Sequence, residues 1–267
     1  MRKTLLLILL GLISIPCFCQ KIETVSERFH YIYLKPEQDM EKLQKDIEER
    51  QRNWQEEFEQ MKANLAEGNR VSDNIKVEVT TRVEQDGDEI NLIVGVSYET
   101  VRLAEEADDY ALGKYTIDNS NACKLMCQFL KDKVENELAS YFVEGTKVDL
   151  KLTGATDGTP IKSRIAYKGE YGDFVEKDIV LNDSPFKMTV TQKSGITTNG
   201  QLAVLRTQGV EDFLKHQVEP LQRTDNRYEI YAVENREKGG GYRRVSIEMI
   251  LHNAFKIDVE PQNTAKP

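Results

Sequence analysis

The sequence predicts an α+β protein, a two-layer sandwich in which helices cover one face of a mixed β-sheet. Three observations predict this class. Runs of alternating apolar residues mark strands, stretches with apolar residues at helical spacing separate them, and Asp-Gly or Gly-rich turns follow several strands. The core order is therefore hairpin, helix, strand, helix, strand, strand. Helices that join strands in this way are expected to pack together on one face of the sheet.

The composition limits the classes of function. The chain has 267 residues, a formal net charge of -9 and a mean hydropathy of -0.54. Its apolar content suffices for one ordinary core. The acidic balance argues against general nucleic-acid binding, which needs a basic surface. We therefore expect no nucleic-acid partner.

The N-terminus has the features of a secretory signal peptide. A basic dipeptide precedes an apolar run that is too short to span a bilayer. We predict that residues 1–19 are removed by cleavage after Cys19, which directs the protein to the periplasm. The alternative is a lipoprotein that is acylated at Cys17 or Cys19 and associated with the outer membrane.

Residues 20–72 are expected to extend the domain with a short strand, over residues 28–34, and one long helix. Over residues 36–66 an apolar stripe recurs at helical spacing, which indicates an amphipathic helix of roughly nine turns. The stripe comprises Met40, Leu43, Ile47, Trp54, Phe58, Met61 and Leu65. Two roles remain open for it: packing on the domain's own surface, or binding to a partner protein or a second copy of the chain.

The domain itself is expected over residues 73–254 and begins with a β-hairpin. An Asp-Gly turn separates two alternating apolar runs, residues 75–83 and 90–98, and this arrangement is a strong hairpin signal. The residues after 254 are rich in Pro, Asn, Thr and Lys. We expect residues 255–267 to form a disordered tail.

A helix is predicted over residues 120–142, with Ser120 or Asn119 as its N-cap. Cys123 and Cys127 lie one turn apart on its apolar face, which is poor geometry for a disulfide, so both are expected to be buried thiols. The remaining chemistry-bearing residues are scattered, and neither a Cys/His metal cluster nor a Ser/His/Asp arrangement can be recognised. We therefore expect no cofactor and no enzymatic activity.

The second half of the chain supplies further strands and one more helix. A strand up to residue 154 ends in a Gly-Ala-Thr-Asp-Gly turn, and residues 161–198 contain β-like segments separated by turn residues. A helix begins near Asn199. The last two strands, "YEIYAV" and "RRVSIEMIL", are joined by a Gly-rich loop, and we expect them to pair with each other as antiparallel neighbours.

This last helix contains the residue on which the functional prediction depends. Leu202, Val210 and Leu214 form an apolar stripe, and Arg206 interrupts it. A buried guanidinium is costly unless it meets an anion. Asp157, in the turn before the insertion, is expected at the same edge of the sheet. Such a pair complements a zwitterion, because the carboxylate accepts an ammonium and the guanidinium binds a carboxylate. The alternative is an internal Asp–Arg ion pair that orders the loop.

These segments resemble the OmpA-like peptidoglycan-binding domain. The family signature is a Gly-x-Thr-Asp turn after a strand, then Asn-x-x-Leu-x-x-x-Arg-x-x-x-Val-x-x-x-Leu, then Asn-Arg-Arg-Val-Glu-Ile near the end. The matching residues are Gly154, Thr156 and Asp157, then Asn199, Leu202, Arg206, Val210 and Leu214, then Arg243, Arg244, Val245 and Ile247. The β-α-β-α-β-β order agrees as well, and the resemblance covers residues 88–253.

The resemblance implies a ligand and a set of ligand residues. In that family the turn Asp and the helix Arg hold the diaminopimelate of the cell-wall peptide, the Asp on an amino group and the Arg on a carboxylate. By resemblance, Asp157 and Arg206 bind peptidoglycan, and Asn199 sets the entry of the helix. Thr156 and Arg244 take supporting or rim positions. The function implied is noncovalent anchoring to the cell wall.

One large departure from the family pattern keeps a second hypothesis open. The family usually has a short loop where this chain has 41 residues between Asp157 and Asn199. The insertion, residues 161–198, must emerge beside the pocket as a lid, a partner-binding hairpin or a plug. The second hypothesis is an envelope protein-protein interaction module that has lost peptidoglycan binding and contacts partners through residues 36–66 and 161–198.

Overall fold

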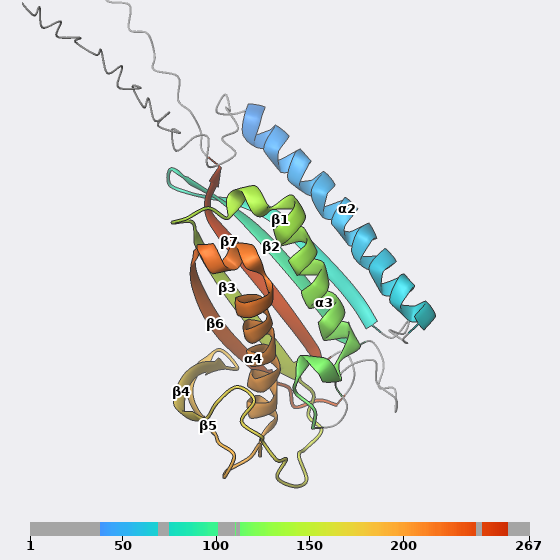
Figure 1. Ribbon diagram of the computed structural model, residues 1–267, viewed down its shortest axis with the longest axis vertical. Coiled ribbons are helices and arrows are strands. Elements are labelled where there is room, and N and C mark those ends of the chain that lie inside the picture. Colours follow the sequence, from blue (N-terminus) through green and yellow to red (C-terminus); the bar gives the residue numbers. More distant parts are fainter. Residues whose placement is uncertain (1–37, 69–74, 101–109, 111–112, 239–241, 256–267) are drawn as a thin grey trace, which may run out of the picture.

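The computed structural model describes residues 38–68, 75–100, 110, 113–238 and 242–255. Within them, three α-helices and a seven-stranded mixed sheet form an α+β fold, which confirms the predicted class (Figure 1). The elements are α2 (Gln38–Gly68), β1 (Ile75–Asp86), β2 (Glu89–Thr100), α3 (Asn121–Asp132), β3 (Lys147–Thr156), β4 (Phe174–Leu181), β5 (Ser184–Val190), α4 (Asn199–Gln217), β6 (Asp225–Glu234) and β7 (Arg244–Phe255).

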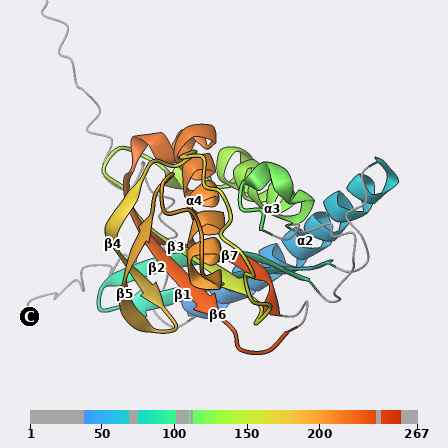
Figure 2. The same ribbon diagram turned by 90° about the horizontal axis from the view of Figure 1, so that it is seen from below.

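The sheet has the strand order β1-β2-β7-β3-β6-β4-β5. β6 runs parallel to both β3 and β4, and the other neighbours are antiparallel. α3 and α4 lie side by side on one face of the sheet, and α2 runs beside α3 along the β1 edge (Figures 1 and 2). Because one face carries the helices, strand residues alternate between burial and exposure, as at Val245, Ile247 and Met249 of β7.

The N-terminal hairpin is confirmed. β1 and β2 pair over their whole lengths, from Ile75 opposite Thr100 to Asp86 opposite Glu89. Gly87 makes the turn with φ near 60°, a value that glycine adopts without the steric cost of a Cβ. The predicted inward face of β2 is buried throughout, at Ile90, Leu92, Val94, Val96 and Tyr98.

The apolar stripe of α2 packs on the chain's own domain, the first of the two alternatives left open by the sequence. Leu43, Ile47, Trp54 and Phe58 are buried in the main core together with residues of β1 and α3. Met40 and Met61 are partly buried against the same core. The stripe is therefore occupied within the chain.

Polar residues of α2 complete the hydrogen bonds of the β1 edge. Gln55 donates from Nε2 to the carbonyl of Val77 at 3.0 Å, and its Oε1 accepts from the Val79 N–H at 2.7 Å. Gln51 accepts from the Thr81 N–H at 3.0 Å. These side chains take the place of a neighbouring strand, so the outer edge of β1 is covered in the manner that prevents edge-to-edge pairing.

We expect Gln55→Met to destabilise the protein by about 1–3 kcal/mol, because the methionine leaves a donor and an acceptor of β1 without partners. The measurement is the free energy of unfolding from urea denaturation. Gln44→Met is the matched control, since Gln44 bonds only Glu48 on an exposed part of the same helix; its effect should stay within about 0.5 kcal/mol. Equal effects of the two substitutions would contradict the edge-covering role.

The predicted helix over residues 120–142 is present in its first half and then changes pitch. Ser120 is the N-cap, as predicted, and its hydroxyl accepts from the Cys123 N–H at 2.9 Å. α3 ends at Asp132 and continues as a π-helical turn, Lys133–Glu137, and then a 3₁₀ turn. In the π turn the buried Lys133 side chain forms ion pairs with Glu57 of α2 and with Glu137, the latter at 2.6 Å. This cluster ties α2 to α3.

The predicted antiparallel pairing of the last two strands is wrong. β6 and β7 run in opposite directions, but β3 lies between them. The reason is topological: β3, α4 and β6 form a β-α-β unit, whose parallel strands lie side by side. β7 therefore pairs on the other side of β3, where it fills the place between β3 and β2.

The insertion, residues 161–198, forms two of the predicted strand segments and adds a second core. β4 pairs with β6 and β5 pairs with β4, so the insertion widens the sheet at one edge. Its buried side chains pack with the first half of α4, in a cluster separate from the main core. That cluster includes Tyr167, Phe174, Met188, Val190 and Ile196 with Leu202, Val204 and Leu205. α4 is therefore enclosed on two sides.

Several predictions lie outside the described residues: the signal peptide, the acylation of Cys17 or Cys19, the strand over residues 28–34, and most of the C-terminal tail. One boundary of the tail can be corrected. Phe255, the first residue assigned to it, is buried and ends β7 because it packs against Tyr141 with ring centroids 5.8 Å apart.

Candidate functional site

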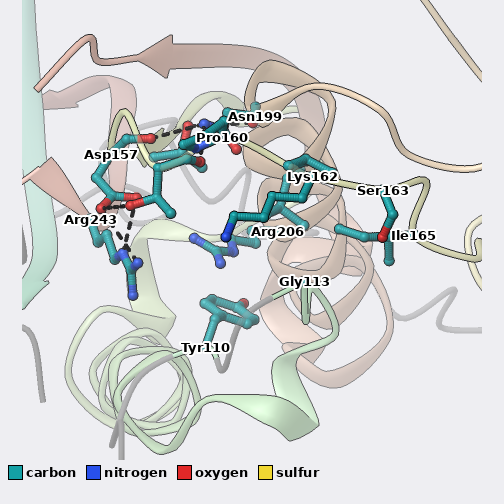
Figure 3. A pocket seen from close by; sticks show the side chains of 14 residues that line it. Tyr110, Gly113, Asp157, Pro160, Lys162, Ser163, Ile165, Asn199, Arg206 and Arg243 are labelled. Atoms are coloured by element: carbon teal, nitrogen blue, oxygen red, sulfur yellow. Dashed lines mark hydrogen bonds and ion pairs between the residues drawn. The ribbon is translucent and has the colours of Figure 1, made fainter. Parts of the chain in front are cut away.

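A cavity of about 360 Å³ lies where β3 ends and α4 begins (Figure 3). One wall is the turn after β3, another is the first half of α4, and a third is the start of the long insertion. The lining residues are Tyr110, Gly113, Thr156, Asp157, Thr159, Pro160, Ile161, Lys162, Ser163, Ile165, Asn199, Leu202, Arg206 and Arg243. Its volume lies at the lower end of the range for small-molecule sites.

Asp157 is held in the turn after β3 by backbone and side-chain contacts. The next residue, Gly158, donates its N–H to the Glu237 carbonyl at 2.7 Å. A Cβ at this position would lie 2.1 Å from the Arg236 carbonyl oxygen, so only glycine fits. The Asp157 carboxylate accepts from the Thr159 hydroxyl at 2.8 Å. The turn therefore fixes a carboxylate, 4 % exposed as a residue, at the wall of the cavity.

Asn199 joins this turn to the start of α4. Its Nδ2 donates to the carbonyls of Asp157 and Thr159, at 3.0 and 2.9 Å. Thr198 caps the helix in a reciprocal arrangement with Gln201, which fixes where the helix begins. Asn199 thus has the helix-entry role that the sequence suggested. Thr156 is buried as well, and its hydroxyl donates to the Asn199 carbonyl at 3.4 Å.

Arg206 lies on the inner wall of the cavity and is 4 % exposed. Its Nε donates to the Lys114 carbonyl at 3.3 Å, and its guanidinium lies over the Tyr110 ring, 4.4 Å from the ring centroid. Within the described part of the chain, no carboxylate forms an ion pair with it. In Figure 3 the guanidinium points into the open space of the cavity above Tyr110.

The carboxylate of Asp157 forms its ion pair with Arg243, not with Arg206. Arg243 Nε lies 3.3 Å from Asp157 Oδ1, and both side chains are largely buried. Figure 3 shows these two side chains facing each other on one side of the cavity, apart from Arg206. The internal Asp157–Arg206 pair considered from the sequence is therefore replaced by an Asp157–Arg243 pair.

The sequence pointed to Arg244 as a rim residue, and the structure brings Arg243 to the cavity instead. Arg244 is exposed and does not line the cavity. The alternation of the strand predicts which of the two arginines faces the cavity. Val245 of β7 faces the helices, so Arg243, two residues earlier, lies on that same side and Arg244 on the opposite one.

Two further residues of the cavity carry no sequence signal of their own. Tyr110 comes from an ambiguous polar stretch, and its ring supports the Arg206 guanidinium. Lys162 comes from the first turn of the insertion and is exposed. The insertion therefore contributes a wall to the cavity and leaves its volume open. The sequence left open that the insertion could plug the site. The insertion lines the cavity and does not fill it.

The charged residues that line the cavity are mostly cationic in the described part of the chain, although the whole chain is acidic. Among the described lining residues, Lys162, Arg206 and Arg243 are cationic and Asp157 is a carboxylate. Apolar side chains of Ile161, Ile165 and Leu202 fill the walls between them. The buried Arg206 guanidinium is the described cation best placed to attract an anionic group, because charge interactions are stronger where water is excluded.

Other chemistry is limited in the described part of the molecule. It contains no group of three or more His, Cys, Asp and Glu side chains placed to hold a metal ion. Cys123 and Cys127 are buried free thiols, as predicted. Hydrogen bonding to Cys123 and burial raise the pKa of the Cys127 thiol, which keeps it protonated and unreactive. Among the described helices, none combines the length and the apolarity needed to cross a membrane.

Comparison with known proteins gives no assignment. No protein-family model matches the chain, and a search of curated proteins finds no match. The chemistry of the cavity and the sequence motifs that form it therefore carry the functional proposal.

Proposed function

We propose that this protein is a periplasmic, noncatalytic component of the cell envelope that binds the diaminopimelate-containing stem peptide of peptidoglycan. The observation that carries the proposal is Arg206. Its guanidinium is buried on the wall of an open cavity, and no carboxylate of the described residues pairs with it. Its donors have the fork geometry that matches a carboxylate, and among the described residues only the Lys114 carbonyl accepts from them.

The shape of the cavity suits the side chain of diaminopimelate. Its terminal carboxylate binds Arg206, and its methylene chain lies against Ile161 and Leu202. The terminal ammonium then approaches the Asp157 carboxylate, which is held at the wall of the cavity by Arg243 and Thr159. The order of elements from β2 to β7, with the insertion between β3 and α4, agrees with the order in the OmpA-like family and supports the proposal.

A pair of peptides that differ in one group tests the proposal. The tripeptide L-alanyl-γ-D-glutamyl-meso-diaminopimelate is titrated into the protein by calorimetry, and the control replaces diaminopimelate with L-lysine. Lysine keeps the ammonium and lacks the terminal carboxylate, so we expect binding of the first peptide and at least tenfold weaker binding of the second. Absence of measurable heat at millimolar tripeptide, or equal binding of the two, contradicts the proposal.

A second candidate function, an envelope protein-protein interaction module, is favoured by a separate observation. The β4–β5 hairpin of the insertion exposes two large apolar side chains, Val175 at 67 % and Phe186 at 42 %. β5 is also the end strand of the sheet, so within the described residues no further strand pairs with its outer edge. Because residues 161–198 contribute a core, deleting them would damage α4. The suitable test is capture of partners from envelope extract with a Val175→Lys, Phe186→Lys variant, which should lose them.

A further inference from the structure

We infer that the cavity has a second anionic subsite, formed by Lys162 beside Arg206, so that it selects ligands with two acidic groups. The inference deepens the proposed function and rests on it for the identity of the ligand. It concerns the residues that the insertion adds, which no motif of the sequence marks as functional.

The first step is the balance of charge inside the cavity. Asp157 and Arg243 form an ion pair at 3.3 Å, with side-chain exposures of 6 % and 17 %, so their opposite charges largely cancel. Among the described residues that line the cavity, the other cationic groups are Arg206 and Lys162. A ligand that brings one carboxylate and one ammonium leaves this excess positive charge uncompensated.

The second step is the position of Lys162. Lys162 and Arg206 line the same cavity, and in the view of Figure 3 the end of the Lys162 side chain is drawn in front of the Arg206 guanidinium. Lys162 follows Pro160 and Ile161, which line the wall, and Ile165 lies three residues further on. The backbone N–H and carbonyl of Ile165 both bond Ile196, at 3.0 and 2.9 Å, so this wall is tied to the second core.

The third step is the ligand chemistry that these two cations fit. The two cations, Arg206 and Lys162, would be stabilised by a ligand that carries two anionic groups a few bonds apart. The stem peptide offers such a pair, because its γ-linked glutamyl residue keeps a free α-carboxylate next to the diaminopimelate residue. We therefore assign the diaminopimelate carboxylate to Arg206 and the glutamyl carboxylate to Lys162.

The test compares the free-acid tripeptide with the same peptide amidated at the glutamyl α-carboxylate. Wild type is expected to bind the free acid about 2- to 5-fold more tightly, as for an exposed charge pair, and the preference should fall at high salt. Lys162→Gln should bind the two peptides equally and bind the amide as wild type does. Lys168→Gln, an exposed lysine of the same insertion outside the cavity, is the control and should keep the preference.

The outcomes separate the inference from the proposed function. If wild type binds both peptides equally, or Lys162→Gln keeps the preference, the inference is overturned while the proposed function stands. If neither peptide binds, the proposed function fails, and an NMR titration with glutarate and its monoamide decides the inference. A preference for glutarate that disappears in Lys162→Gln upholds the two-anion site; no such preference overturns it.

Discussion

Replacing Arg206 by alanine is expected to weaken binding of the diaminopimelate tripeptide by roughly 10- to 150-fold. Hydrogen bonds to a charged group contribute about 1.5–3 kcal/mol, and about 1.4 kcal/mol corresponds to a factor of ten in the dissociation constant. Arg206→Lys keeps the charge and loses the planar fork, so an intermediate loss is expected. Calorimetric titration of the three proteins gives the order of their affinities.

The stability of the same variants shows whether the loss is local. Arg206 pairs with no carboxylate in the described residues, and its alanine variant loses one carbonyl contact and the Tyr110 stacking while removing a buried positive charge. The free energy of unfolding should therefore stay within about 1 kcal/mol of wild type. Arg164→Ala, an exposed arginine of the insertion, is the control for binding. Undiminished affinity in the Arg206 variants would exclude this residue as the carboxylate ligand.

Replacing Trp54 by alanine is expected to destabilise the protein by about 3–5 kcal/mol, the usual cost of removing a large buried aromatic side chain. Trp54 is 1 % exposed, and its indole N–H donates to Glu137 at 2.7 Å. The ring also lies near the ammonium of Lys133, so the substitution disturbs the charged cluster between α2 and α3. Denaturation followed by far-UV circular dichroism measures the loss.

Two further substitutions separate packing from polar contacts at this position. Trp54→Phe keeps an aromatic ring and removes the donor to Glu137, so it should cost about 1–3 kcal/mol. Met61→Ala, on the same helix and only partly buried, should cost less than Trp54→Ala. A loss below about 1 kcal/mol for Trp54→Ala would mean that α2 contributes little to the stability of the domain.

The elements that the sequence predicts well are those fixed by local signals. The β1–β2 hairpin follows from an Asp-Gly turn between alternating runs, and Ser120 marks the start of α3 through short-range capping. The pairing of β7 could not be found in this way. Its neighbours are distant in sequence, and alternation specifies which face of a strand is buried without specifying which strand lies beside it.

The residues of the candidate site that belong to sequence motifs could be predicted. The residues that tertiary packing brings to the site could not. The turn with Asp157 and the helix with Arg206 do line one cavity, as the sequence suggested. The ion pair of Asp157 with Arg243 depends on β7, whose partner strand was mispredicted. Lys162 and Tyr110 line the cavity through tertiary structure, which the residue pattern of their own segments does not predict.

The attachment of the cavity to two separate cores has a thermodynamic consequence. The turn with Asp157 belongs to the main sheet, whereas the wall with Lys162 is held by the smaller cluster under the β4–β5 hairpin. Such a cluster opens more often than a main core, because local opening costs less free energy where fewer contacts are broken. A ligand that contacts both walls would bind the closed hairpin and not the open one. Increasing the ligand concentration would therefore raise the free energy needed to open the hairpin.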